Sequence, residues 1–273
     1  IELAAAWLEA LTLPEIADAI AHSLDILATE QRGVPARQRS IRAVFDTSWQ
    51  LLTDRERAVL PMLSVFRAGF AREAAEFVAA AGLRDLLGLV NKSWLQMTND
   101  ELRPTNAERT ASAGGSEFVT RSSSLATSSA RFQIHELLRQ YAEEKLREWP
   151  ELETQARDRA SRYFARFLES QLRRMLGPEQ TRAFDAVAQE FDDIREAWHW
   201  WLHQGAFERL TDQMLLPLFI YATSRFAGAD VGPLLEAAIE KRTTNDESGI
   251  ANEESGPPAT SEPAAARTPA PSS

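Results

Sequence analysis

The 273-residue chain contains no cysteine. Disulfide bonds, thiolate metal sites and cysteine nucleophiles are therefore excluded. No apolar run approaches the roughly 20 residues that a membrane-spanning helix needs. The first residues contain Glu2 and no basic stretch, so they do not have the pattern of a secretory signal peptide. From these absences we expect a cytoplasmic protein without a membrane partner.

Glycine-rich phosphate-binding patterns are also missing, since neither G-x-x-x-x-G-K-[ST] nor G-x-G-x-x-G occurs. The backbone cradle that binds nucleotide phosphates is thus not expected within this chain. Lys and Arg total 30 against 40 Asp and Glu, a net charge of −10, which argues against nucleic-acid or anionic-membrane binding over the whole surface. We therefore predict that the chain itself is not an enzyme, with no catalytic residues, metal site or bound cofactor.

The start of the sequence has a helical pattern without a helix start. Ile1–Leu8 has neither an initiating Met nor an N-cap residue. A helix without its first turn leaves N–H groups that preceding residues normally satisfy. We expect the chain to be a piece of a longer protein, with functional parts on its N-terminal side.

Helical periodicity continues through the first half of the chain. One apolar stripe is formed by Ile41, Val44, Phe45, Ser48, Leu51 and Leu52. Thr53 with Glu56 forms a capping box that begins a second helix, expected to run to Gly69. Pro61 should kink that helix or delay its start. Further helices are predicted over 72–81 and 83–90.

A β-hairpin pattern follows these helices. Residues 94–98 alternate as in a strand, and 131–134 form a second short strand that leads into another helical stripe. The Ser-, Thr-, Ala- and Gly-rich segment 104–130 is interpreted as a flexible insertion at the hairpin tip. Helices followed by a two-stranded hairpin are typical of a winged helix, a variant of the helix-turn-helix.

The remainder of the chain is predicted to be an array of antiparallel helices. Three apolar stripes follow one another. The first ends at Gly177-Pro178 and consists of Tyr163, Phe164, Phe167, Leu168 and Leu172. The second ends at Gly205 and consists of Phe184, Val187, Phe191, Ile194, Ala197, Trp198 and Trp201, and the third begins at Phe207. Paired helices with glycine at the turns are typical of a solenoid of the tetratricopeptide (TPR) type. Thr243–Ser273 is rich in Pro, Ser, Thr, Ala and Glu, and we expect it to be disordered. The predicted fold class is thus mainly α.

Metal-binding patterns are incomplete. The segment His135–Arg139 begins like a zinc-protease helix but lacks the second histidine. His199 and His203 have an i, i+4 spacing that is compatible with a metal site. The favoured interpretation is that they are side chains able to carry a positive charge near the C-terminus of a helix that ends before Gly205.

Two clusters in the last predicted stripe could also carry chemistry. Asp192 and Asp193 would point about 100° apart on a helix, so we expect both to lie on a solvated face rather than to act together as a catalytic acid and base. Trp198 and Trp201 share the core face, whereas Trp200 lies off it and is expected to contact a neighbouring helix.

Direct DNA reading is not expected of the predicted winged helix. Its groove-entering helix is taken to be Ala71–Ala81, which carries Arg72 against Glu73 and Glu76. A helix that reads the major groove needs several basic or amide side chains.

Several motifs, in the correct order, resemble the STAND signal-transduction ATPases, in particular bacterial regulators with an NB-ARC-like ATPase. They are Ile1–Trp7, Arg39–Trp49, Leu63–Phe66 with Gly69-Phe70, Leu89–Ser93 and Ile134–Ala142. The resemblance covers residues 1–146 and, more weakly, 151–218. It implies that residues 1–38 end the helical subdomain of the ATPase, 39–149 form the winged helix and 150–242 begin the TPR-like array.

The same resemblance implies a role for one residue. Ile134-His135-Glu136 matches the family's Met-His-Asp motif, whose histidine reaches the β-phosphate of bound ADP and holds the resting state. A histidine at a helix N-terminus is a favourable place for an anion. A His135 that only caps or packs the junction is the alternative. The phosphate loop and ADP or ATP with Mg²⁺ would belong to the intact parent protein.

Three functional hypotheses follow. The first is a non-catalytic regulatory fragment of a STAND-type ATPase and transcriptional regulator, whose winged helix holds the nucleotide-bound state and whose array senses a protein or peptide. The second is a winged-helix transcriptional regulator that binds DNA. The third is a plain protein-interaction module.

Overall fold

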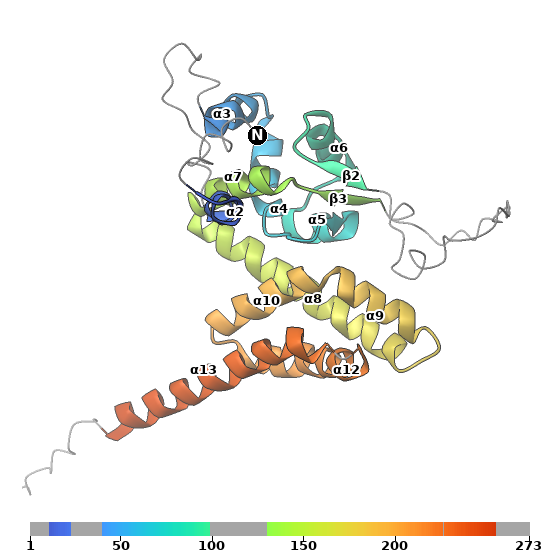
Figure 1. Ribbon diagram of the computed structural model, residues 1–273, viewed down its shortest axis with the longest axis vertical. Helices are drawn as coiled ribbons and strands as arrows, with labels where there is room; N and C mark the ends of the chain where they lie inside the picture. The colour runs from blue at the N-terminus through green and yellow to red at the C-terminus, as the bar shows by residue number, and fades with distance from the viewer. Residues whose placement is uncertain (1–10, 23–39, 99–129, 226, 255–273) are drawn as a thin grey trace, which may run out of the picture.

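One long helix, α8 (Pro150–Met175), joins two groups of helices in the computed structural model (Figure 1). The structure describes residues 11–22, 40–98, 130–225 and 227–254. The expected flexible insertion at 104–130 lies outside these residues, except for Ala130, which precedes a strand.

The group that precedes α8 combines helices with a small sheet. Its helices are α2 (Leu13–His22), α3 (Ile41–Gln50), α4 (Asp54–Leu63), α5 (Arg72–Ala79), α6 (Leu83–Asn91) and α7 (Glu136–Arg147). Its strands are β1 (Phe70–Ala71), β2 (Gln96–Thr98) and β3 (Arg131–Gln133), antiparallel in the order β1-β3-β2. The predicted hairpin pairs as expected. The third strand, β1, was not predicted, because two residues are too few to show an alternating pattern.

The predicted capping box at the start of α4 is confirmed. The Thr53 N–H donates to Glu56 Oε2 at 2.7 Å, and the Glu56 N–H donates to Thr53 Oγ1 at 3.3 Å. The helix begins at Asp54 and ends at Leu63, so neither the delayed start nor the extension to Gly69 occurs. Pro61 lies in the last turn of α4, three residues before the chain leaves the helix, which is compatible with its fixed φ.

An aromatic cluster fastens α3 to α7. Tyr141 donates its hydroxyl hydrogen to Asp46 Oδ1 at 2.7 Å, and its ring lies 5.6 Å from Phe45, 6.0 Å from Trp49 and 5.9 Å from Trp94 between centroids. Burial and the Asp46 carboxylate raise the pKa of Tyr141 far above its usual value, so the hydroxyl remains a neutral donor. Two of the motifs that carry the family resemblance therefore meet in space.

The second group contains α8 and the helices that follow it. These are α9 (Gln180–Gln189), α10 (Phe191–His203), α11 (Phe207–Arg209), the π-helical η5 (Leu210–Leu215), α12 (Leu216–Arg225) and α13 (Gly228–Glu254). The single helix expected over 184–201 is wrong: the chain bends at Glu190, with φ −97° and ψ 7°, and forms two helices. Glu190 pairs there with Arg131 of β3, a contact between distant segments that local periodicity cannot reveal.

The expected disorder from Thr243 onward is wrong for residues 243–254. These residues continue α13, which begins on buried Val231 and Leu234. A helix that is already nucleated by packing adds one hydrogen bond for each residue it fixes, so α13 can continue into this polar segment. The rest of the predicted disordered tail, 255–273, lies outside the described residues.

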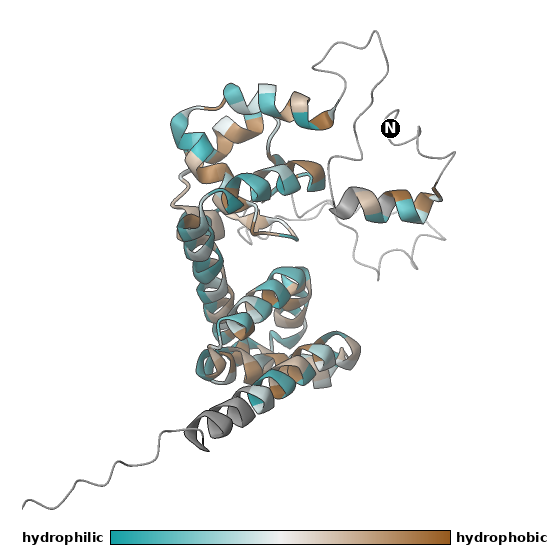
Figure 2. Cartoon of the chain, turned by 90° about the vertical axis from the view of Figure 1, so that its left-hand side faces the viewer, coloured by the Kyte–Doolittle hydropathy of each residue, from teal (hydrophilic) through white to brown (hydrophobic). Residues whose placement is uncertain are grey.

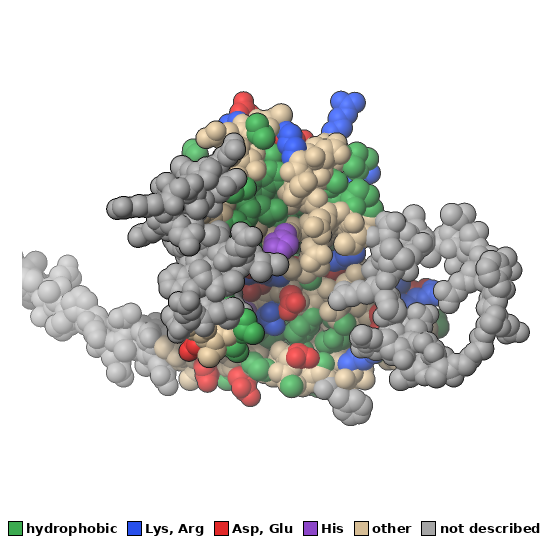
Figure 3. Space-filling view, turned by 45° about the horizontal axis from the view of Figure 1, so that its top comes forward, with side chains coloured by type: hydrophobic (Ala, Val, Ile, Leu, Met, Phe, Trp, Pro, Cys, Tyr) green, Lys and Arg blue, Asp and Glu red, His purple; other side chains and the backbone are tan. Residues whose placement is uncertain are grey.

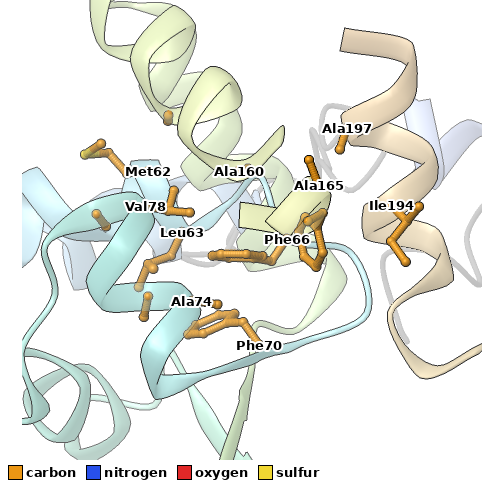
Figure 4. Close-up of a cluster of buried hydrophobic side chains, with 14 of the residues drawn as sticks. Met62, Leu63, Phe66, Phe70, Ala74, Val78, Ala160, Ala165, Ile194 and Ala197 are labelled. Carbon is orange, nitrogen blue, oxygen red and sulfur yellow. The ribbon is translucent and has the colours of Figure 1, made fainter. Parts of the chain in front are cut away.

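A single hydrophobic cluster runs across the junction between the two groups. Figure 4 shows Leu63 and Phe66, from the end of α4 and the loop after it, beside Ala165 of α8 and Ala197 of α10. In Figure 2, hydrophobic residues (brown) alternate with hydrophilic residues (teal) along the helices, the pattern of helices that pack on one face. The helix α8 begins at Pro150, and the core continues across this point. None of the described helices is both long and apolar enough to cross a membrane.

Gly69 makes the turn that brings β1 to β3. Its φ is +86°, and a Cβ built there would lie 2.9 Å from the backbone oxygen of Phe132.

We predict that Gly69→Ala lowers the free energy of unfolding by about 3 kcal/mol, because backbone strain and a clash with the sheet add together. Gly205 is the matched control, since its φ is +69° but it has no atom within 4 Å of the added Cβ. Gly205→Ala should cost about 1 kcal/mol. Equal losses in urea unfolding would contradict the role of the close approach.

Candidate functional site

His135 lies at the junction of β3 and α7, as the sequence predicts. It is the N-cap of α7, with φ −60° and ψ 139°, and its side chain is exposed. Its Nδ1 atom accepts a hydrogen bond from the Leu137 N–H at 3.3 Å. The sequence alone left open whether this residue caps the helix or faces a ligand, and the structure establishes the cap.

The cap fixes which ring nitrogen of His135 can face a ligand. A backbone N–H only donates, so Nδ1 must offer its lone pair, and the neutral ring then carries its hydrogen on Nε2. Among the described residues, no partner bonds to Nε2. An exposed donor thus accompanies the positive end of the α7 dipole, where an anion is favoured.

A buried arginine stands one turn after His135. Arg139 is 3% exposed and donates to Glu136 at 2.7 and 2.8 Å and to Glu143 at 3.0 Å. The hydrogen bond from Arg139 holds the pKa of Glu136 below its usual range. The carboxylate beside His135 is therefore ionised but already paired, which reduces its repulsion of an incoming anion.

Glu143 connects α7 to the array. It is 7% exposed and accepts hydrogen bonds or ion pairs from Arg139 at 3.0 Å, Arg157 at 3.0 Å and Arg147 at 3.2 Å. Burial acts to raise the pKa of Glu143, but Arg139 and Arg147 outweigh it and hold the pKa below its usual range. We call Glu136, Arg139, Glu143 and Arg157 the Glu143 network.

The network reaches a third helix through an aromatic ring. The Arg157 guanidinium lies 5.8 Å from the centre of the Trp200 ring of α10, a distance at which a cation and a ring attract each other. Trp200 therefore contacts a neighbouring helix, as predicted, while Trp198 and Trp201 are buried in the core as predicted. Polar contacts thus extend from the residue after His135 to the middle of the array.

Asp193 was expected to be solvated together with Asp192, and this is wrong. Asp192 is exposed and pairs with Arg195 at 2.8 Å, whereas Asp193 is only 2% exposed. The Asp193 carboxylate accepts the backbone N–H of Arg67, and the N–H of Ala68 at 3.3 Å. It therefore caps the loop between α4 and β1 from the opposite side of the junction.

A signal for this burial was present in the sequence. Asp193, Ala197 and Trp200 are spaced i, i+4 and i+7, so they share one side of α10. Burial raises the pKa of Asp193 to about 7; Glu190 also raises it, while the N–H groups of Arg67 and Ala68 and the charge of Arg131 lower it. The free energy lost by removing the carboxylate from water thus exceeds the free energy gained from its hydrogen-bond donors.

Further contacts cover the helix that sequence reasoning assigned to the DNA groove. Phe77 of α5 lies 5.9 Å from the Tyr163 ring of α8, and Arg159 donates to the carbonyl of Val78 at 3.2 Å. Because α8 occupies this face, α5 cannot enter a groove with it. In the order of the elements, the helix directly before the hairpin is α6.

The outer face of α6 is more apolar than basic. Leu83 and Leu87 are 45% and 40% exposed, and Arg84 is the cation between them. Lys92, just after the helix, is held by Glu56 at 2.5 Å. The face of the molecule in Figure 3 mixes acidic and basic side chains without a broad area of one sign among the coloured residues.

Among the described residues, no group of three or more His, Asp or Glu side chains is placed to hold a metal ion. His199 is half-buried, which lowers its pKa, and His203 is exposed.

The buried Asp193 generates a pH-dependent prediction. Its folded-state pKa is raised from 3.8 to about 7, so the folded protein binds this proton more tightly than the unfolded chain. Its contribution to stability should therefore fall as pH rises from about 4 to about 7 and level off above that. In Asp193→Asn the group cannot ionise, and all other titrating groups are shared. Urea unfolding at pH 5, 6, 7 and 8 should show wild type losing several kcal/mol relative to the variant. A difference that is constant, or that grows in favour of wild type with pH, would contradict this account.

Comparisons with known proteins give relatives but no family. No protein-family model matches the chain. Relatives from Mycobacterium tuberculosis and Mycobacterium bovis, each named "Putative HTH-type transcriptional regulator", are 27% identical over 205 residues, which is 75% of this chain and 21% of each relative. The chain thus spans about a fifth of their length.

A solved structure from Pyrococcus horikoshii, a STAND protein with a tetratricopeptide repeat sensor, aligns over 90% of this chain and 40% of that chain at 16% identity. Its TM-score of 0.27 is too low to carry an argument. The chain is therefore similar to segments of regulatory proteins.

Proposed function

We propose that this chain is the regulatory, non-catalytic part of a larger STAND-type transcriptional regulator. Its helices and hairpin around His135 hold the nucleotide-bound resting state, and its array responds to a protein or peptide partner. The names of the relatives support a regulatory role, and the order of motifs from Arg39 to Ala142 supports the STAND assignment. The required partner is an ATPase module that carries the phosphate loop, Mg²⁺ and ADP or ATP.

The observation that carries the proposal is the line of polar contacts that leads from Glu136, the residue after His135, to the array. His135 offers Nε2–H at the positive end of α7, which suits a phosphate oxygen. One turn later, Arg139 enters the Glu143 network, which continues to Arg157 of α8 and Trp200 of α10. A displacement of the array would thereby move the helix that presents His135.

A switch of this kind needs only two states with different affinity for nucleotide. A partner that binds the array better when α7 has left the nucleotide shifts the population toward the open state. The shift cannot exceed the partner's preference for that state. His135 would contribute one charge-assisted hydrogen bond, worth about 1.5–3 kcal/mol. The isolated chain should accordingly bind ADP very weakly.

DNA binding by this chain is less well supported. The names of the relatives mention a helix-turn-helix, but they do not say which segment forms it, and four fifths of each relative lies outside the match. Within this chain, α5 is covered by α8 and α6 exposes two leucines with one arginine. Phosphate neutralisation and base readout need more cationic and amide groups than this face offers.

We predict that His135→Ser in the longer protein weakens ADP binding by roughly 10- to 150-fold, with faster ADP dissociation and no loss of stability. Serine preserves the N-cap but cannot reach a phosphate, whereas His135→Ala removes both functions and costs about 1 kcal/mol of stability as well. ADP retained after gel filtration and its dissociation rate are the measurements. Thermal unfolding separates the loss of the cap from the loss of the donor.

His203→Ser is the matched control, since His203 is exposed at the far end of α10, and it should retain ADP as wild type does. Unchanged ADP retention in His135→Ser would contradict the nucleotide role and favour a plain interaction module. Retardation of duplex DNA at low salt that is lost in Arg84→Ala would favour the DNA-binding hypothesis instead.

A further inference from the structure

An apolar pocket that is open to solvent lies among α10, α11, η5 and α13, away from His135 and the Glu143 network. It has a volume of about 290 Å³ and is lined by Trp198 of α10, Phe207 of α11, residues of η5, and Leu235, Ile239 and Arg242 of α13. This volume is near the lower end of the roughly 300–1,000 Å³ that small-molecule sites occupy. Among the described residues that line it, Arg242 is the one with a charge.

The walls of this pocket are fixed by specific contacts. Trp198 donates its indole N–H to the carbonyl of Leu234 at 3.0 Å, which holds α13 against α10. Thr211, the remaining polar residue of the lining, gives its hydroxyl hydrogen to the Phe207 carbonyl at 2.9 Å. The indole donor and this hydroxyl hydrogen are thus already used within the protein, so the wall offers a ligand mainly apolar contact.

The η5 segment is a second and independent observation. Residues 210–215 form a π-helix, and Leu210, Thr211 and Leu215 of this segment line the pocket. π-Helical turns are rare and occur frequently at functional sites. A regular α-helix here would present a different set of side chains to α13.

The charge at the edge of the pocket indicates the ligand class. The Arg242 side chain is exposed and also borders an adjoining, more polar cavity of about 740 Å³ that Glu208 and Asp212 line, but no ion pair joins Arg242 to a side chain that the structure describes. A guanidinium at the edge of an apolar pocket favours a molecule with an apolar body and one anionic end, since the charge is paired while the body is removed from water. We propose that this pocket binds a free medium-chain carboxylate. The inference goes beyond the proposed function, because it requires neither nucleotide nor DNA.

The test uses the 273-residue chain with decanoate as the probe and decanol as its uncharged counterpart, both below the concentration at which they aggregate. Isothermal titration calorimetry should show saturable binding of one decanoate per chain. Arg242→Gln should weaken decanoate binding roughly tenfold or more, since a charge-assisted contact is lost, and should change decanol binding less than twofold. Lys241→Gln, the neighbouring cation outside the lining, should change neither.

A pocket-filling variant provides a second readout. Ala238 lines the pocket and is half-buried, so Ala238→Phe should weaken both probes while thermal unfolding confirms a folded chain. Absence of saturable decanoate binding to wild type would overturn the proposal, as would equal effects of Arg242→Gln and Lys241→Gln. His135→Ser should bind decanoate as wild type does, so failure of the nucleotide role and failure of this site are distinguishable.

Discussion

The contact of Asp193 with the backbone N–H groups of Arg67 and Ala68 is the constraint on which the arrangement of the two helix groups depends. A carboxylate buried to 2% exposure is costly unless donors surround it, and unpaired buried N–H groups are costly as well. Each side of the junction therefore requires the other. Because Asp193 belongs to α10 and its donors to the loop after α4, these hydrogen bonds fix the array relative to the preceding helices, and removal of one partner within the packed junction leaves the others buried and unpaired.

Other interactions at the junction extend this constraint. Arg131 of β3 pairs with Glu190 and also donates to the carbonyl of Gly69 at 3.1 Å, so the sheet is tied to the bend between α9 and α10. The rings of Phe66 and Phe164 lie 6.2 Å apart within the shared core. In addition to these contacts, the Glu143 network forms a second connection between α7 and the array, and it begins beside His135. The region around His135 and the first array helices can thus move as one body, as the proposed control of a nucleotide contact by the array requires.

The sequence predicted the local features of this structure well. Helix periodicity, the capping box of Thr53 and the hairpin strands depend on neighbouring residues, and the structure contains them. The position of His135 at a helix start is local in the same sense. The mainly helical fold with a small antiparallel sheet followed from these elements.

The errors arose where distant segments decide the outcome. Asp193 is buried because the loop after α4 reaches it, the stripe from Phe184 to Trp201 is divided at Glu190 where β3 contacts it, and α5 is covered because α8 returns across it. The spacing of Asp193 with Ala197 and Trp200 indicates that it shares a face with them, but local periodicity does not name the distant partner in any of these contacts. The proposed contact of His135 with nucleotide likewise involves the ATPase module of the proposed parent protein and leaves no periodic pattern in this chain.

Native-state hydrogen exchange of α7 and α10 tests the central claim, the joint movement of the two groups, most directly. If the junction unites them, the protected amides of both helices should open with the same free energy, and Asp193→Ala should lower both by the same amount. Opening of α10 at a lower free energy than α7, with α7 unaffected by the substitution, would show two independent units and contradict the account.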